Sequence, residues 1–180
     1  WLAKGIGNTA GKWLDSSGNN NHAIQGTSGN QAVSIADDGL NFEGGSNHYY
    51  DLTSKITVST NHNFLLAMVV TIESYDSLNC ILSDGTNEFI EFQTNKKLRI
   101  KTLDGSATTS VLTESAAEFA AGSKILIVVS RNDGSTGTLN VYKGGDLLEG
   151  SWSNQENPKA IEFANLGIRA DSDRPFDGII

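Results

Sequence analysis

The feature that most constrains this chain is a long succession of short apolar or alternating runs, separated by Gly, Asn, Asp and Ser. Such runs are typical of β-strands, whereas the periodicity of helices is nearly absent. The best helix candidate is short and covers residues 114–122, before Gly122. The expected strands cover residues 22–26, 32–36, 39–44, 48–52, 64–72, 79–84, 88–94, 97–103, 110–114, 124–131, 138–144, 147–153, 161–169 and 176–180.

The turn residues between these runs agree with an antiparallel arrangement. Asp-Gly and Gly-Gly pairs supply the positive φ angles that tight hairpins need. Many short strands at this spacing predict an all-β fold, an antiparallel sandwich or barrel. The runs at 64–72 and 124–131 are apolar throughout, so we expect both of their faces to be covered. The run at 97–103 alternates and should have one wet face.

Composition limits the classes of protein that this chain can belong to. Its 180 residues contain no linker or repeat, so we expect one domain over 1–180. The formal net charge of -8 repels phosphate and argues against nucleic acid and anionic membranes as partners. The longest apolar run, 64–72, is far shorter than a membrane span of about 18–20 residues. A single cysteine, Cys80, excludes an internal disulfide.

Several motifs resemble one family. The stretches are WLDSSGNNNHA (13–23), DGLNFEG (38–44), YY (49–50), KILIVVSRNDGSTGTLNVYKGG (124–145) and FDGII (176–180). In this order they resemble the concanavalin A-like, laminin G-like jelly rolls of bacterial surface proteins and phage structural proteins. The resemblance covers almost the whole chain and implies a two-sheet antiparallel β-sandwich of the lectin-like type. Its motifs are turns and core aromatics, which mark the fold and not a ligand.

The resemblance also assigns the opening stretch. It implies that Trp13 fills the core between the sheets, while Asp15 and Ser17 bond to nearby backbone and Gly18 takes a conformation that other residues resist. We expect Phe42 to be a core residue as well. The family's last strand runs further than Ile180, and the chain begins without Met. We therefore expect a segment of a longer chain, with a final strand that pairs beside the first.

Two acidic stretches are calcium candidates. Oxygen ligands alternate from position 15 to position 21, as in an EF-hand, but the glycine and the twelfth-position glutamate that the motif needs are missing. Asp171, Asp173 and Asp177 precede the last strand, and such dense oxygen ligands could hold calcium. The alternative is a solvated loop in which Arg174 offsets the charge. We expect no cofactor, with calcium as the one candidate.

Catalytic constellations are not evident. Glycosidases need two carboxyl groups about 5–9 Å apart across a cleft, and the nearest pair is Glu88 and Glu91. An odd separation on a strand sends these side chains to opposite faces. Cys80 is flanked by apolar residues and should be a buried, inert thiol. We expect surface or turn positions for the histidines, and we expect no enzymatic activity.

Glycan contact is the remaining binding chemistry. Loop aromatics can stack on sugars and loop amides can bind hydroxyls, so Trp152, Asn154 and Tyr75 are the candidate ligand residues. The alternative is that these aromatics belong to the core.

We therefore expect a non-catalytic surface module of a larger assembly, such as a phage virion or a bacterial envelope protein. It would serve decoration, adhesion or glycan contact, on a virion surface or outside the cell. Its partners would be other structural subunits or cell-surface glycans. The alternatives are a dedicated carbohydrate-binding lectin and, less in keeping with the residues, a glycoside hydrolase. Fold alone does not choose among them.

Overall fold

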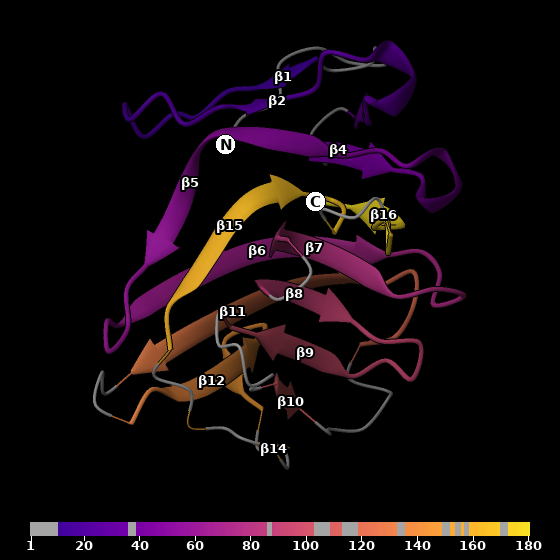
Figure 1. Cartoon of the computed structure of the whole chain (residues 1–180). Helices are drawn as coiled ribbons and strands as arrows, with labels where there is room; N and C mark the ends of the chain where they lie inside the picture. The colour runs from indigo at the N-terminus through magenta and orange to yellow at the C-terminus, as the bar shows by residue number, and fades with distance from the viewer. Residues whose placement is uncertain are drawn as a thin grey trace.

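The computed structural model describes residues 11–35, 39–85, 88–102, 109–112, 119–132, 136–148, 152–153, 156, 159–169 and 173–180, with 109–112 and 152–153 given as backbone. These residues form a two-sheet antiparallel β-sandwich, which confirms the all-β prediction (Figure 1). The helical segments among them are two single 3₁₀ turns, Ser28–Asn30 and Gly44–Ser46. In the described part of the chain, no helix is long and apolar enough to cross a membrane.

One sheet has nine described strands and the other has seven, and all recorded pairings are antiparallel. In spatial order, the nine-stranded sheet contains β1 (Lys12–Trp13), β2 (Ala23–Ile24), β5 (Tyr50–Val58), β15 (Ile161–Leu166), β7 (Asn79–Asp84), β8 (Glu88–Phe92), β9 (Leu98–Lys101), β10 (Thr109–Leu112) and β14 (Trp152–Ser153). The seven-stranded sheet contains β13 (Asp146–Leu147), β12 (Thr138–Lys143), β11 (Lys124–Asn132), β6 (Phe64–Ile72), β16 (Gly178–Ile179), β4 (Gly39–Phe42) and β3 (Val33–Ile35).

The core lies between the two sheets and is rich in aromatic rings. Phe42 packs edge-on against Tyr50 and Phe176, with ring centroids 5.9 and 6.0 Å apart. Both Trp13 (7% exposed) and Phe42 (0%) belong to this core cluster, as predicted. Aromatic side chains bury large apolar areas, and edge-to-face pairs add a further preference for this geometry.

The opening stretch forms the turn that the sequence predicts. The carboxylate of Asp15 accepts hydrogen bonds from Ser17 N (2.8 Å) and from Asn21 N (2.9 Å). The bond from the Ser17 backbone is the main cause of a lowered pKa for Asp15. Gly18 has a φ of 88°, which a residue with a side chain rarely adopts. The run of small polar residues is therefore a closed turn that leads Trp13 into the core.

The structure also corrects several strand predictions. The strand expected at 48–52 is β5 and continues through polar residues to Val58. The final strand β16 pairs with β4 and β6, and so lies in the opposite sheet from the first strand. The helix expected at 114–122 falls mostly outside the described residues, and its described end at 119–122 forms a turn. The expected strand at 147–153 is divided between the ends of the two sheets.

Candidate functional site

The outward side of the seven-stranded sheet carries an exposed apolar surface. Exposed fractions are 71% for Leu65, 46% for Val69, 41% for Leu126 and 45% for Leu147. The sequence predicts that both faces of β6 and β11 are covered, and the structure contradicts this for the outward face. We call the surface the outer apolar face, and it consists of Leu65, Ala67, Val69, Leu126, Val128, Tyr142 and Leu147.

Strand register makes the outer apolar face continuous. Leu147 lies opposite Tyr142, Tyr142 opposite Val128, and Val128 opposite Ala67, so one row crosses four strands. In the neighbouring row Leu126 lies opposite Val69. Directly opposed side chains in an antiparallel pair lie about 5 Å apart, close enough to touch.

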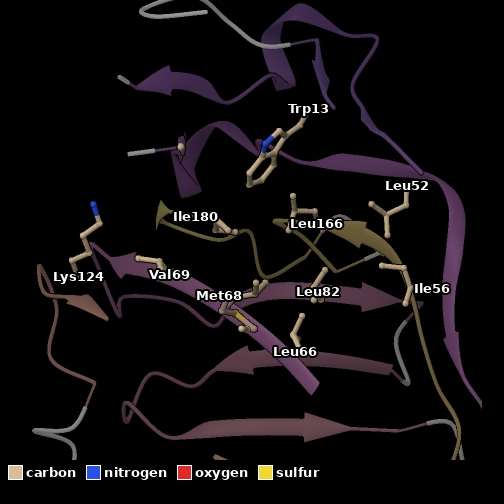
Figure 2. A pocket seen from close by; sticks show the side chains of 13 residues that line it. Trp13, Leu52, Ile56, Leu66, Met68, Val69, Leu82, Lys124, Leu166 and Ile180 are labelled. Carbon is tan, nitrogen blue, oxygen red and sulfur yellow. The ribbon is translucent and has the colours of Figure 1, made fainter. Parts of the chain in front are cut away.

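A cleft between the two sheets is the second feature (Figure 2). It encloses about 530 Å³. Leu66 and Met68 of β6 form one wall, and Leu82 and Leu166 of the other sheet face them across the gap. The complete lining, called the inter-sheet cleft, is Trp13, Gly39, Leu52, Ile56, Leu66, Ala67, Met68, Val69, Ile81, Leu82, Lys124, Leu166 and Ile180.

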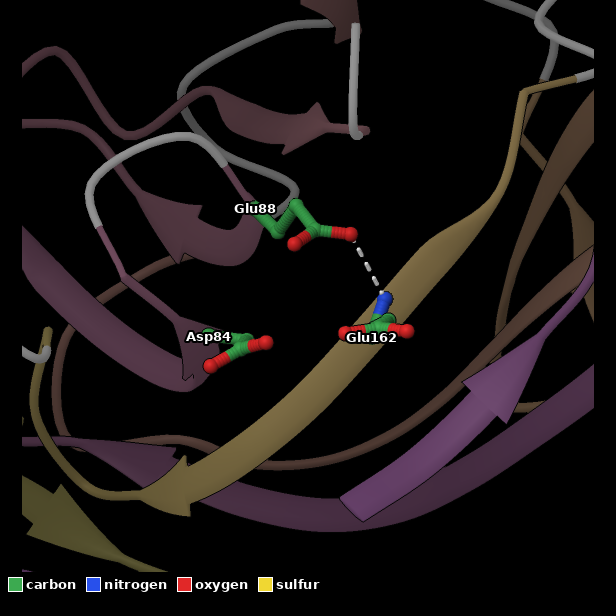
Figure 3. A group of neighbouring side chains, drawn as sticks. All are labelled: Asp84, Glu88 and Glu162. Carbon is green, nitrogen blue, oxygen red and sulfur yellow. Dashed lines mark hydrogen bonds between the residues drawn. The ribbon is translucent and has the colours of Figure 1, made fainter.

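Three carboxylates meet where β7 ends and β8 begins (Figure 3). Asp84, Glu88 and Glu162 each place a carboxylate oxygen within 4.8 Å of the others. Strand β7 pairs with β15 at Leu82 and Ser83 and ends at Asp84, so β15 continues past its neighbour. Glu88 Oε1 accepts the Glu162 N–H at 2.9 Å. This side-chain oxygen thus supplies the acceptor that a neighbouring strand would otherwise provide.

The charges of this acidic cluster are partly balanced by a lysine. Lys55 Nζ lies 2.5 Å from Asp84 Oδ2 and 3.3 Å from Glu162 Oε2. Glu88 is only 3% exposed, and burial raises its pKa to about 7, with a further rise from the charges of Asp84 and Glu162. Near neutral pH the cluster can therefore hold and release a proton. Its oxygens suit a hard divalent cation, but Lys55 already supplies a positive charge there.

The second carboxylate of β8 is in a different environment. Glu91 is fully buried and is paired with Arg174 Nη1 at 2.8 Å and with Arg99. Both guanidinium groups also lie over the ring of Phe89, at 5.5 and 4.9 Å. Glu88 and Glu91 thus have separate partners, as the prediction of opposite faces requires.

The candidate glycan residues are not gathered by the described contacts. Tyr75 is half-buried against the core, and its hydroxyl donates to Phe119 O at 2.6 Å. Burial also raises the pKa of the Tyr75 hydroxyl. Trp152 lies in the edge strand β14, where its backbone pairs with Leu112, and Asn154 lies outside the described residues. A glycan-binding role for these residues stays a prediction.

Two of the three candidate calcium residues, Asp173 and Asp177, have partners of other kinds. Asp173 is exposed and ion-paired with Arg169 at 3.1 Å and with Arg174 at 3.7 Å. Asp177 Oδ1 accepts the Gly44 N–H at 3.3 Å, and Asp171 lies outside the described residues. These contacts fit the solvated-loop alternative for Asp173, and calcium binding stays a prediction.

Cys80 is buried, as predicted, and burial raises the pKa of its thiol. The histidines do not all lie at the surface. His48 is 6% exposed, and its Nδ1 accepts the Glu43 N–H, so it is part of the interior.

The acidic cluster was not found from the sequence. Asp84 and Glu88 flank one hairpin turn, so their proximity could have been read from the Asp-Gly pair at 84–85. Glu162 is remote in the sequence and joins them through sheet pairing. Comparisons with protein-family models, curated proteins and solved structures find no match to this chain.

Proposed function

We propose that this chain is a non-catalytic module of a larger protein assembly and that it associates through the outer apolar face. The order of motifs in the sequence favours placing its sandwich among the lectin-like, concanavalin A-like jelly rolls. Decoration and adhesion are the roles that suit such a module, on a virion or on a cell surface. We name a second copy of this chain as the partner of the face.

The observation that carries this proposal is the continuous apolar row over β6, β11, β12 and β13. Monomeric proteins rarely expose a large contiguous apolar patch, and such patches mark interaction surfaces. The residues here are not scattered, since strand register aligns them on one face of the sheet. A flat apolar sheet face can pack on a copy of itself at about 10 Å, as two sheets do in a sandwich.

Association through the outer apolar face would bury apolar side chains that are exposed in the single chain. Burying a Leu or Val side chain fully is favourable by about 1.5–3 kcal/mol. Four side chains of the outer apolar face are between 41% and 71% exposed, so each has a large part of that energy still to gain. The net charge of -8 opposes contact between copies in general, and the seven residues of the outer apolar face add no charge to this repulsion.

Sedimentation velocity over a range of protein concentrations tests the proposal. The unaltered chain should form a dimer as concentration rises, and the double variant Leu65→Ser/Leu126→Ser should remain a monomer with an unchanged β-sheet spectrum. Leu14→Ser is the matched control, because Leu14 is 41% exposed and lies just after β1 in the other sheet. An unaltered chain that stays monomeric throughout, or a double variant that dimerises equally well, would contradict the proposal.

A second experiment tests the proposal that the chain has no catalytic activity. The chain is incubated with a panel of β-glucans and galactans, and released reducing sugar is measured. We expect no release. Reproducible release that Glu88→Gln or Asp84→Asn abolishes would show that the acidic cluster is catalytic.

A further inference from the structure

Strand β6 has an edge that no described strand occupies. On one side it pairs with β11 from Phe64 to Thr71. On the other side β16 pairs with it at Ile72 and Thr71 alone. In the described part of the chain, the stretch from Phe64 to Val70 therefore pairs with a neighbouring strand on one side only, although β6 lies in the interior of the strand order.

Hydrogen bonds on either side show which backbone groups point to this edge. Glu73 N donates to Asp177 O on the β16 side. Because backbone direction alternates along a strand, Thr71, Val69, Ala67 and Leu65 direct their N–H and C=O groups to that same side.

The neighbouring strand gives the same answer independently. Gly144 N donates to Leu126 O, so Leu126 directs its backbone groups to β12, away from β6. The next residue, Ile127, then faces β6, where it lies opposite Met68. The backbone groups of Met68, and of the residues two positions away on either side, therefore point to β11. Leu65, Ala67 and Val69 point to the open side.

The inter-sheet cleft lies beside this edge (Figure 2). Leu66 and Met68 extend into the cleft from β6, while Leu82 and Leu166 approach from the other sheet. Ile180, directly after β16, also lines the cleft. The cleft thus continues the line of β16 along β6. It combines a row of backbone donors and acceptors with apolar walls, and that combination fits an extended peptide strand.

We propose that the edge of β6 between Phe64 and Val70 binds an extended segment of a different protein, not of a second copy of this chain. The segment adds to β6 in the antiparallel direction, in line with β16. Its alternate residues are apolar, because those opposite Leu66 and Met68 enter the cleft. The inference rests on the proposed role as an assembly module, but it concerns backbone groups and the cleft, whereas dimerisation uses outward side chains.

The overall charge of the chain bears on the flanks of the partner segment. The formal net charge of -8 attracts a segment with lysine at its ends over a long range, and these lysines also keep the segment soluble. Within the cleft the charged lining residue is Lys124, so the lysines of the segment must lie outside the paired stretch. A suitable probe is a capped peptide of alternating threonine and valine with a lysine at each end. The control probe has proline in place of each threonine, which removes the N–H groups that a ladder needs.

Hydrogen exchange of single amides measures the occupation of the edge. Without the probe, the Leu65, Ala67 and Val69 amides should exchange faster than those of Leu66 and Met68. With the probe, exchange of the three edge amides should slow by at least about tenfold, and the proline peptide should have no effect. If the edge amides are already protected in the unaltered chain at low concentration, its own residues fill the edge and the proposal is wrong. If protection of the edge amides grows with protein concentration when no probe is present, a second copy fills the edge. That result also contradicts the proposal.

A variant of the edge gives the second readout. Ala67→Pro removes an N–H that points to the open side and leaves the ladder with β11 intact, so the fold should persist while probe binding is lost. Ala67→Thr is the matched control, because it changes the side chain and keeps the N–H. Equal probe binding by Ala67→Pro and the unaltered chain would overturn the proposal. Loss of dimerisation in Leu65→Ser/Leu126→Ser tests the proposed function. Probe binding to the β6 edge is a separate measurement and tests only the present inference.

Discussion

The buried carboxyl of Glu88 should make the stability of this protein depend on pH in an unusual direction. The substitution Glu88→Gln tests this, because the glutamine Oε1 can still accept the Glu162 N–H but carries no charge. In the folded chain the pKa of Glu88 is about 7, whereas its ordinary value is 4.5. The folded state therefore binds the proton more tightly than the unfolded state does.

The sign and the size follow from proton linkage. A raised pKa contributes stability that is fully present below pH 4.5 and is lost as the pH rises through the folded value of about 7. A difference of about 2.5 pH units at about 1.4 kcal/mol each gives about 3 kcal/mol. The free energy of unfolding of the unaltered chain, relative to Glu88→Gln, should fall by about this amount between pH 4 and pH 8.

Urea unfolding of both proteins at several pH values measures this difference. Glu73→Gln is the control for a general effect of removing a carboxylate, because Glu73 is exposed just beyond β6. A further variant, Lys55→Ala, removes the ammonium that lowers the pKa of Glu88, so the pH at which stability is lost should rise. Parallel stability curves for Glu88→Gln and the unaltered chain would refute the reasoning.

Four further substitutions test the interior. Replacing Trp13 or Phe42 with Ala should cost about 3–5 kcal/mol, and a thermal melt that matches the unaltered chain would refute the core assignment. Tyr75→Phe removes the donor to Phe119 O and should lower the free energy of unfolding, measured in urea, by about 1 kcal/mol, whereas an unchanged value would contradict a stabilising role for this bond. Arg131→Met should destabilise by about 3 kcal/mol or more, because the fully buried guanidinium binds three backbone carbonyls; an unchanged denaturation midpoint would contradict this.

The parts of the fold that sequence could predict are those set by local chemistry. Asp-Gly and Gly-Gly pairs marked hairpins, and Gly85, Gly144 and Gly145 have positive φ angles, as such turns require. The turn from Asp15 to Asn21 and the burial of Trp13 were expected from the family resemblance of the opening stretch, whereas its residues alone left a metal-binding or glycan-binding loop open.

The parts that sequence could not predict depend on pairings between remote segments. The second half of β5 is rich in polar residues, with Ile56 and Val58 as its apolar ones, and it becomes a strand because β15 pairs with Ile56, Thr57 and Val58. The apolar runs of β6 and β11 suggested that both faces of these strands are buried. Residue type alone does not tell whether the outward face is covered by this chain or by another molecule. Glu162 lies beside Glu88 because of sheet pairing, and the two residues are too far apart in the sequence for their spacing to predict this contact.

The position of β16 also determines the order in which the seven-stranded sheet can be completed. This strand, near the end of the printed sequence, lies between β4 and β6, which are made much earlier during synthesis. Gly178 leaves no room for a Cβ beside Thr71 O, and Gly39 leaves none beside Ile180 O, so the insertion is tight on both sides. Among the described strands, the β3–β4 ribbon joins β6 only through β16, so a ribosome must finish residues 177–180 before these two parts of the sheet can become one.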